Sequence, residues 1–111
     1  AARALVGLGP SLAGQAALLT HTVQALLDTL KDKDGNVRRY AIRALGDLGP
    51  SLGGHPGLLT DTDQALLDTI KDEDRAVRWS AARALGDLGP SLAGQAALLT
   101  HTVQTLLGRF K

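Results

Sequence analysis

The sequence predicts an all-α fold, an α-solenoid in which about six helices stack as antiparallel pairs in a 40-residue repeat. The first support is self-similarity: a shift of 40 residues aligns AARALVGLGP (1–10) with AIRALGDLGP (41–50) and AARALGDLGP (81–90). The second is composition, because 44% of the 111 residues are hydrophobic and these are mostly Leu and Ala. Leu and Ala favour helices over strands, and one helix pair cannot bury its apolar face alone.

The first helix of each pair is predicted from residues 16–31. At 100° per residue, six apolar side chains fall within an arc of about 100°, as an amphipathic helix requires. They are Ala16, Leu19, Val23, Leu26, Leu27 and Leu30. This arc is expected to face the core.

The second helix is predicted over residues 36–48, with Asp34 or Asn36 as its N-cap. Its apolar positions follow the i, i+4, i+7, i+8, i+11 pattern: Val37, Ala41, Ala44, Leu45 and Leu48. Gly49–Pro50 is expected to end it, with the glycine in a left-handed conformation and the proline unable to continue the helix. Gly9–Pro10 and Gly89–Pro90 predict the same ending.

Asp63 disturbs this pattern, because it takes the core position that Val23 and Val103 hold in the other copies. A buried, unpaired carboxylate is costly. We therefore expect the middle first-type helix to begin late, with Asp61 as N-cap and Gln64 completing a capping box. Asp63 would then lie in the first turn.

The repeat divides the chain into a half-unit at 1–10, repeats at 11–50 and 51–90, and a half-unit at 91–111. Residues 1–30 and 81–110 are identical at 24 of 30 positions, which is typical of a recent duplication or an engineered, consensus-like array. The unpaired terminal helices carry apolar side chains and predict a homo-oligomer that associates through its ends. These side chains are Leu5, Val6 and Leu8 at one end and Leu106, Leu107 and Phe110 at the other.

Two segments share one pattern: LLDTLKDKDGNVRRYAIRALGDLG (26–49) and LLDTIKDEDRAVRWSAARALGDLG (66–89). Each has an apolar helix, an Asp-rich turn, Val-Arg, and an Ala-rich helix that ends in Leu-Gly. They resemble HEAT repeats, and most closely the HEAT-like repeat of phycobilisome lyases. The resemblance implies a ladder between adjacent repeats, built from a turn Asp and the Arg after Val. The matching residues are Asp32 with Arg38, and Asp72 with Arg78. The chain departs from the family's commonest pattern by inserting PSLAGQAAL and its copies between pairs, so the resemblance does not imply a particular curvature.

The sequence predicts a non-catalytic protein without cofactor or metal. Cysteine is absent, and no GxSxG, HExxH or phosphate-loop string occurs. His21, Asp61 and His101 share one repeat position. Neighbouring helices lie about 8–10 Å apart, too far for one zinc ion, whose ligand atoms lie near 2 Å. These residues are therefore expected to be solvated turn residues.

The second-type helices carry the candidate binding face: Arg3, Arg39, Arg43, Trp79 and Arg83. The HEAT resemblance implies that this helix lines the side where protein partners bind, and Trp and Arg are frequent at interaction hot spots. The alternative is that the arginine stems cover an Ala-rich surface while Trp79 simply packs.

The predicted function is a scaffold for protein–protein binding or self-assembly. A net charge of +1 makes nucleic acid a poor partner, although binding along the arginine row remains an alternative, as does an accessory role related to bilin lyases. No apolar run reaches the roughly 18 residues of a membrane span, and the start does not resemble a signal peptide. A cytoplasmic location is the default expectation.

Overall fold

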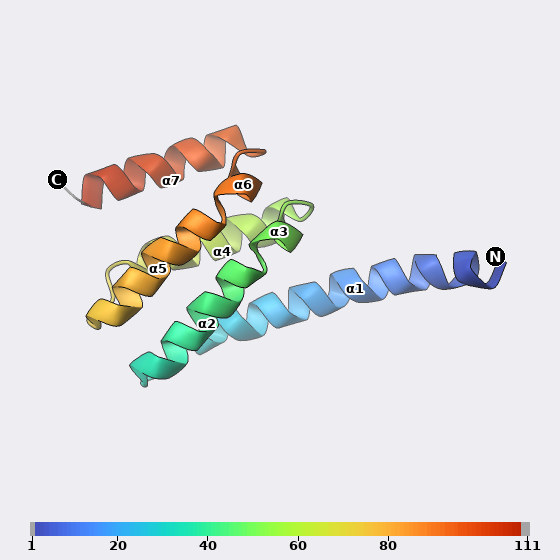
Figure 1. Ribbon diagram of the computed structural model, residues 1–111, viewed down its shortest axis with the longest axis horizontal. Coiled ribbons are helices and arrows are strands. Elements are labelled where there is room, and N and C mark those ends of the chain that lie inside the picture. The colour runs from blue at the N-terminus through green and yellow to red at the C-terminus, as the bar shows by residue number, and fades with distance from the viewer. Residues whose placement is uncertain (1, 110–111) are drawn as a thin grey trace.

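The computed structural model describes the backbone of residues 2–109 and the side chains of residues 14–108. Over that range the regular structure is helical, as predicted (Figure 1). The helices are α1 (Ala2–Thr29), α2 (Gly35–Asp47), α3 (Gly49–Leu52), α4 (Pro56–Thr69), α5 (Arg75–Asp87), α6 (Gly89–Leu92) and α7 (Ala96–Arg109).

The long helices form two layers. The first-type helices α1, α4 and α7 make one layer, in which α4 contacts both α1 and α7. The second-type helices α2 and α5 lie side by side in the other layer, and each packs against the first helix of its own pair (Figure 1). The one-turn helices α3 and α6 connect the pairs and also touch each other. The predicted stack of helix pairs is confirmed.

The beginning of the chain differs from the prediction, because α1 continues through Gly9–Pro10 instead of dividing there. Where the same dipeptide does interrupt a helix, the interruption is held by packing. The Ser91 hydroxyl donates to the Gly49 carbonyl oxygen at 2.6 Å and joins α6 to α3. The Gly–Pro signal therefore permits a break, and tertiary contacts decide whether the break occurs.

The ends of the second-type helices confirm one expectation and correct another. Asp34 is the N-cap of α2 and accepts from the Asn36 N–H at 2.8 Å, and Asp74 does the same for α5. The expected left-handed glycine is absent: no described residue has a positive φ. Instead Gly49 opens α3, and Pro50 lies at the start of that helix, where a missing N–H breaks no hydrogen bond.

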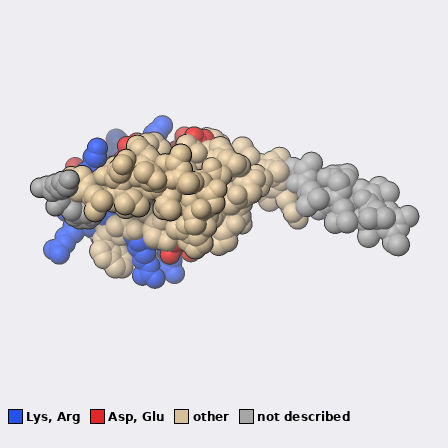
Figure 2. Space-filling view, turned by 90° about the horizontal axis from the view of Figure 1, so that it is seen from above, with Lys and Arg blue, Asp and Glu red and all other residues tan. Residues whose placement is uncertain are grey.

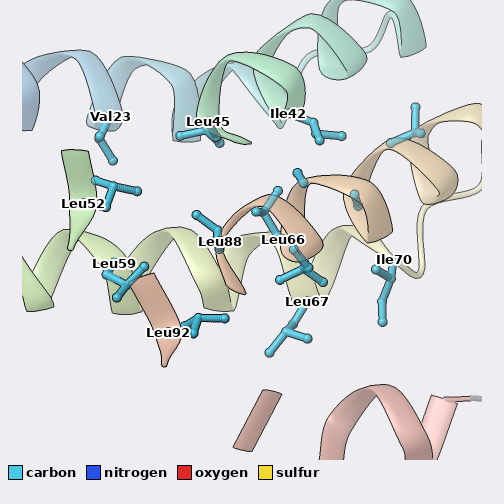
Figure 3. Close-up of a cluster of buried hydrophobic side chains, with 14 residues drawn as sticks. Val23, Ile42, Leu45, Leu52, Leu59, Leu66, Leu67, Ile70, Leu88 and Leu92 are labelled. Atoms are coloured by element: carbon cyan, nitrogen blue, oxygen red, sulfur yellow. The ribbon is translucent and has the colours of Figure 1, made fainter. Parts of the chain in front are cut away.

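The core lies between the two layers and is aliphatic (Figure 3). Val23 is fully buried, and the remaining leucines of the predicted arc pack against the cluster. Ile42 and Leu52 are also fully buried, although the periodicity did not single them out. Leu52 belongs to α3 and lies with Val23 and Leu59 (Figure 3), so the connector is part of the core.

The α2–α5 contact depends on small residues. Ala84 of α5 is buried where it meets Gly46 of α2. A Cβ built on Gly46 would lie 3.3 Å from the Ala84 Cβ and 3.2 Å from an Asp87 carboxylate oxygen. Only glycine leaves this approach unobstructed, so Gly46 sets how closely α5 can stack on α2.

An ion pair joins one repeat to the next, as the resemblance implied, but Arg38 pairs with Asp72 of the next repeat and not with the Asp32 carboxylate. The Arg38 guanidinium donates to both Asp72 carboxylate oxygens, at 2.9 and 3.0 Å, and also to the Asp32 and Lys33 carbonyl oxygens. Burial alone would raise the pKa of Asp72, but the Asp74 N–H and the Arg38 guanidinium lower it. Arg78, at the equivalent position, donates to the Asp72 and Glu73 carbonyl oxygens.

The prediction that the middle first-type helix begins late is wrong. Helix α4 begins at Pro56, so Asp61 is not a cap, and Asp63 lies in mid-helix with its side chain fully buried. The Thr102 hydroxyl donates to one Asp63 oxygen at 2.7 Å, and the other oxygen has no partner in the described structure. Burial raises the pKa of Asp63, against the lowering effects of the Thr102 hydrogen bond and the His101 charge.

The 40-residue repeat also explains a second buried polar group, the Thr62 hydroxyl. The Thr62 hydroxyl is also buried without a described partner. Thr62 corresponds to Thr102, and the position across from it corresponds to Asp63 but is occupied by Val23. The α1–α4 interface therefore contains the donor without its acceptor.

Arg38→Ala should lower the free energy of unfolding by about 3 kcal/mol, because it leaves Asp72 half-buried without its counter-charge. Arg78→Ala is the matched control: it removes hydrogen bonds to the same kind of carbonyl but no described ion pair, and should cost about 1 kcal/mol. Urea denaturation of both variants measures the difference. Equal losses would show that the ion pair contributes nothing beyond the carbonyl contacts.

Asp63→Val should raise the free energy of unfolding at neutral pH by about 1–3 kcal/mol, because it removes a poorly satisfied buried carboxylate. Since the folded-state pKa of Asp63 is raised, the parent protein loses stability as pH rises above about 4. The gain should therefore be small in acid and grow toward neutrality in thermal melts across pH. Asp61→Val, on the exposed side of α4, controls for the loss of one negative charge and should show neither trend.

Candidate functional site

The candidate site is the outer surface of the second-type helices, here called the α2–α5 face. It comprises Arg39, Tyr40, Arg43, Asp47, Trp79, Ser80, Arg83 and Asp87. Because α2 and α5 pack side by side one repeat apart, residues 40 positions apart are neighbours across the face. This places Arg43 beside Arg83, and Arg39 beside Trp79.

Two aromatic side chains on this face are exposed to solvent. Trp79 is 64% exposed and Tyr40 is 73% exposed. The Arg83 guanidinium carbon lies 5.8 Å from the centre of the Trp79 ring, within the range of a cation–π contact. Trp79 therefore does not pack into the core. The alternative that Trp79 serves only to fill the interior is excluded.

The arginines of the face share a hollow with Asp47 and Asp87 but form no ion pair with them within 4.0 Å among the described residues. Arg39 donates to the Asn36 side-chain oxygen at 3.4 Å. Among the described residues, the ion pair within 4.0 Å is that of Arg38 and Asp72, so the intrahelical pairs Arg43–Asp47 and Arg83–Asp87 are not formed at that distance. The guanidinium groups remain available to a carboxylate from outside.

Three shallow hollows cross the α2–α5 face, and Arg39 borders all of them. A hollow of about 310 Å³ lies over the paired Arg43 and Arg83, and one of about 490 Å³ lies between Trp79 and Arg75. A third, of about 110 Å³, lies beside Tyr40. This arrangement suits an extended chain that runs across both helices better than a small molecule enclosed on all sides.

The structure brings Arg39, Arg43, Trp79 and Arg83 together as the sequence predicted, whereas the Arg3 side chain lies outside the described residues. Tyr40 was missed. Its repeat counterpart is Ser80, so the row of arginines gave no reason to include it, although it is the other aromatic residue of a second-type helix.

The predicted association ends are described only in part. Leu107 is 59% exposed on α7 and Leu106 is partly buried, while Phe110 and the side chains of Leu5, Val6 and Leu8 lie outside the described residues. Val103 is 45% exposed on the same helix. Figure 2 looks onto the α7 side and shows a surface there with few charged side chains.

His21, Asp61 and His101 are all exposed and lie on α1, α4 and α7 rather than in turns. No three potential metal ligands gather among the described residues. Nor does any helix in that part of the chain have the length and apolar character needed to cross a membrane.

A family model described as HEAT repeats matches residues 23–105, which includes all of α2–α6 and most of the contacts described above. The chain belongs to the HEAT repeat family. No curated protein and no solved structure matches it. HEAT repeats generally serve as scaffolds for protein–protein interaction. The α2–α5 face is the exposed candidate surface of this HEAT repeat protein for such binding.

Proposed function

We propose that this HEAT repeat protein is a non-catalytic scaffold that binds an extended acidic segment of a protein partner on its α2–α5 face. The observation that carries the proposal is the exposed Trp79, bordered by hollows and by arginines without a carboxylate partner among the described residues. Aromatic residues and arginine are enriched where proteins bind one another.

The partner's chemistry follows from the two halves of the face. Arg43 and Arg83 offer planar guanidinium groups that bind carboxylates bidentately. Trp79 offers an apolar ring to an aliphatic or aromatic side chain on the same segment. Asp47 and Asp87 border the arginine hollow and would repel carboxylates placed beyond it, which fixes the position of the acidic group.

Selection from a displayed random-peptide library should enrich sequences that combine Asp or Glu with an apolar residue. Trp79 is the chain's single tryptophan, so its fluorescence reports binding at the face directly. Arg43→Glu with Arg83→Glu should weaken the selected peptides more than tenfold, or about 1.4 kcal/mol. Lys31→Glu with Lys71→Glu makes the same charge change at equivalent turn positions and should have little effect.

Three outcomes would count against this proposal: enrichment of basic peptides, equal losses in the two double variants, or no change in Trp79 emission on binding. Binding of duplex DNA that weakens steeply with salt would instead support the nucleic-acid alternative along the arginine row. The lyase-type resemblance rests on the pattern of residues 26–49 and 66–89, which belongs to the scaffold. Binding of a tetrapyrrole would support an accessory role of that kind.

Self-association through α7 is a second candidate, favoured by a difference between equivalent positions. Leu67 is 2% exposed and Asp63 is fully buried, whereas their counterparts Leu107 and Val103 are 59% and 45% exposed. No described element covers this face of α7. We propose that a second copy of the chain covers it.

Leu107→Asp should therefore shift the 111-residue chain toward monomer, because a charge in an apolar interface is costly to desolvate. Light scattering across concentration measures the mass. Gln104→Asp, also exposed on α7, adds the same charge next to the apolar positions and should shift the equilibrium less. A parent chain that stays monomeric at the highest concentrations would refute the association.

A further inference from the structure

A groove of about 590 Å³ lies between α1 and the first connector, on the side of α3 that faces away from α6. Its lining is mostly apolar: Gln15, Ala16, Leu18, Leu19, Thr22, Leu48, Ser51 and His55. Leu18 is 65% exposed there. An open apolar groove of this size between packed helices raises the question of what fills it.

The equivalent place one repeat further along is filled by α3. A shift of 40 residues carries Leu48 and Ser51 onto Leu88 and Ser91. The Ser91 hydroxyl donates to the Gly49 carbonyl oxygen at 2.6 Å, and a Cβ on Gly49 would lie 3.2 Å from Leu88. The Leu52 side chain of α3 is fully buried in the core at this position. The segment GPSL is thus what the second groove contains.

The chain has the same segment in position for the first groove. Residues 9–12 read GPSL, as do 49–52 and 89–92. Residues 8–24 are moreover identical to residues 88–104. The later copy forms α6, a turn and α7, whereas the earlier copy lies within α1. One sequence therefore supports both a bent and a straight form, and the surroundings select between them.

We propose that the segment Gly9–Leu12 of the same chain docks in this groove, so that the N-terminal helix has an open, straight form and a closed, bent form. In the closed form Leu12 takes the place that Leu52 holds one repeat later. The Ser51 hydroxyl donates to the Gly9 carbonyl oxygen, and residues 2–8 lie along α2 as α2 lies along α5.

The segment's own chain is the occupant because only a short connection separates it from the groove. Gln15 and Ala16 already line the groove, and Ala13–Gly14 corresponds to the turn Ala93–Gly94. A tether this short gives the segment an effective concentration that a second copy in dilute solution does not reach. Pro10 also favours bending, since within a helix it removes one hydrogen bond and crowds the preceding turn.

Closure would change the α2–α5 face. Arg3, Arg43 and Arg83 are equivalent positions in the three copies. Packing residues 2–8 on α2 places Arg3 beside Arg43 and extends the arginine row by one helix. The groove and the binding face are thereby coupled, although the docking itself does not depend on the function proposed above.

A pair of introduced cysteines tests the closed form, because the chain has none of its own. The test pair is Val6→Cys with Ala44→Cys. A shift of 40 residues carries these positions onto Gly46 and Ala84, where a Cβ built on Gly46 would lie 3.3 Å from the Ala84 Cβ. In the straight form Val6 lies about 15 Å along the helix axis from Ala16, beyond the reach of a disulfide to the α2 layer. The control pair Gly53→Cys and Ser91→Cys has a Cβ separation of 4.0 Å and should cross-link in either form.

Mild oxidation of dilute protein should give an intramolecular disulfide in both pairs, seen as faster-migrating monomer on a non-reducing gel. Disulfide-linked dimers of the Val6–Ala44 pair would assign the groove to a second copy and overturn the proposal. No cross-link in that pair, with the control cross-linked, would also overturn it.

A thermal melt provides a second measurement that needs no cross-link. Leu12→Ala should lower the melting temperature by several degrees, in the same range as Leu52→Ala, because both leucines would fill equivalent grooves. An unchanged melting temperature for Leu12→Ala beside a clear loss for Leu52→Ala would show that Leu12 stays outside the groove.

Discussion

The stacking of α5 on α2 is the contact on which the other features depend. The helices approach closely where Gly46, which has no Cβ, meets Ala84. Close approach in a 40-residue register brings Arg38 within hydrogen-bonding distance of Asp72 and buries the aliphatic layer beneath. The same register lines up Arg39, Arg43, Trp79 and Arg83 on the outside. The packing of α5 on α2 therefore determines both the core and the arrangement of the candidate site.

Much of this arrangement could be predicted because it is repeated. The apolar arc around Val23 follows from periodicity, and the neighbouring positions of Arg43 and Arg83 follow from the 40-residue shift. The cap at Asp34, one of two candidates, follows from the residue types that precede the helix. Local chemistry predicted less well where two structures suit the same residues. The identical stretches 8–24 and 88–104 adopt different forms, and Gly49 begins a new helical turn in an ordinary right-handed conformation. No rule based on neighbouring residues can separate cases whose sequences are the same.

Asp63 shows the limit of reasoning from cost. A buried carboxylate is unfavourable, so the sequence predicted a helix that begins late enough to leave the Asp63 carboxylate in its first turn. The helix instead begins at Pro56, and this start includes the buried Leu59, which a helix capped at Asp61 would leave out. Burial of Leu59 opposes the cost of a carboxylate that the Thr102 hydroxyl partly satisfies. What sequence reasoning missed was the partner, which lies on a helix 39 residues away.

Nearly identical repeats raise a problem of specificity, since any first-type helix could stack on any other. The polar residues of the middle copy distinguish the two interfaces of α4. Thr102 finds an acceptor in Asp63, whereas Val23 takes the repeat position of Asp63 in α1 and Thr62 has no partner among the described residues. If α1 and α7 exchanged places around α4 in the same register, Thr22 would take the place of Thr102, because residues 8–24 and 88–104 are the same. The hydrogen bond therefore specifies register and direction along the stack rather than the identity of the copy. Identity must come from the positions where the copies differ, such as Ala25, Asp28 and Thr29 against Thr105, Gly108 and Arg109.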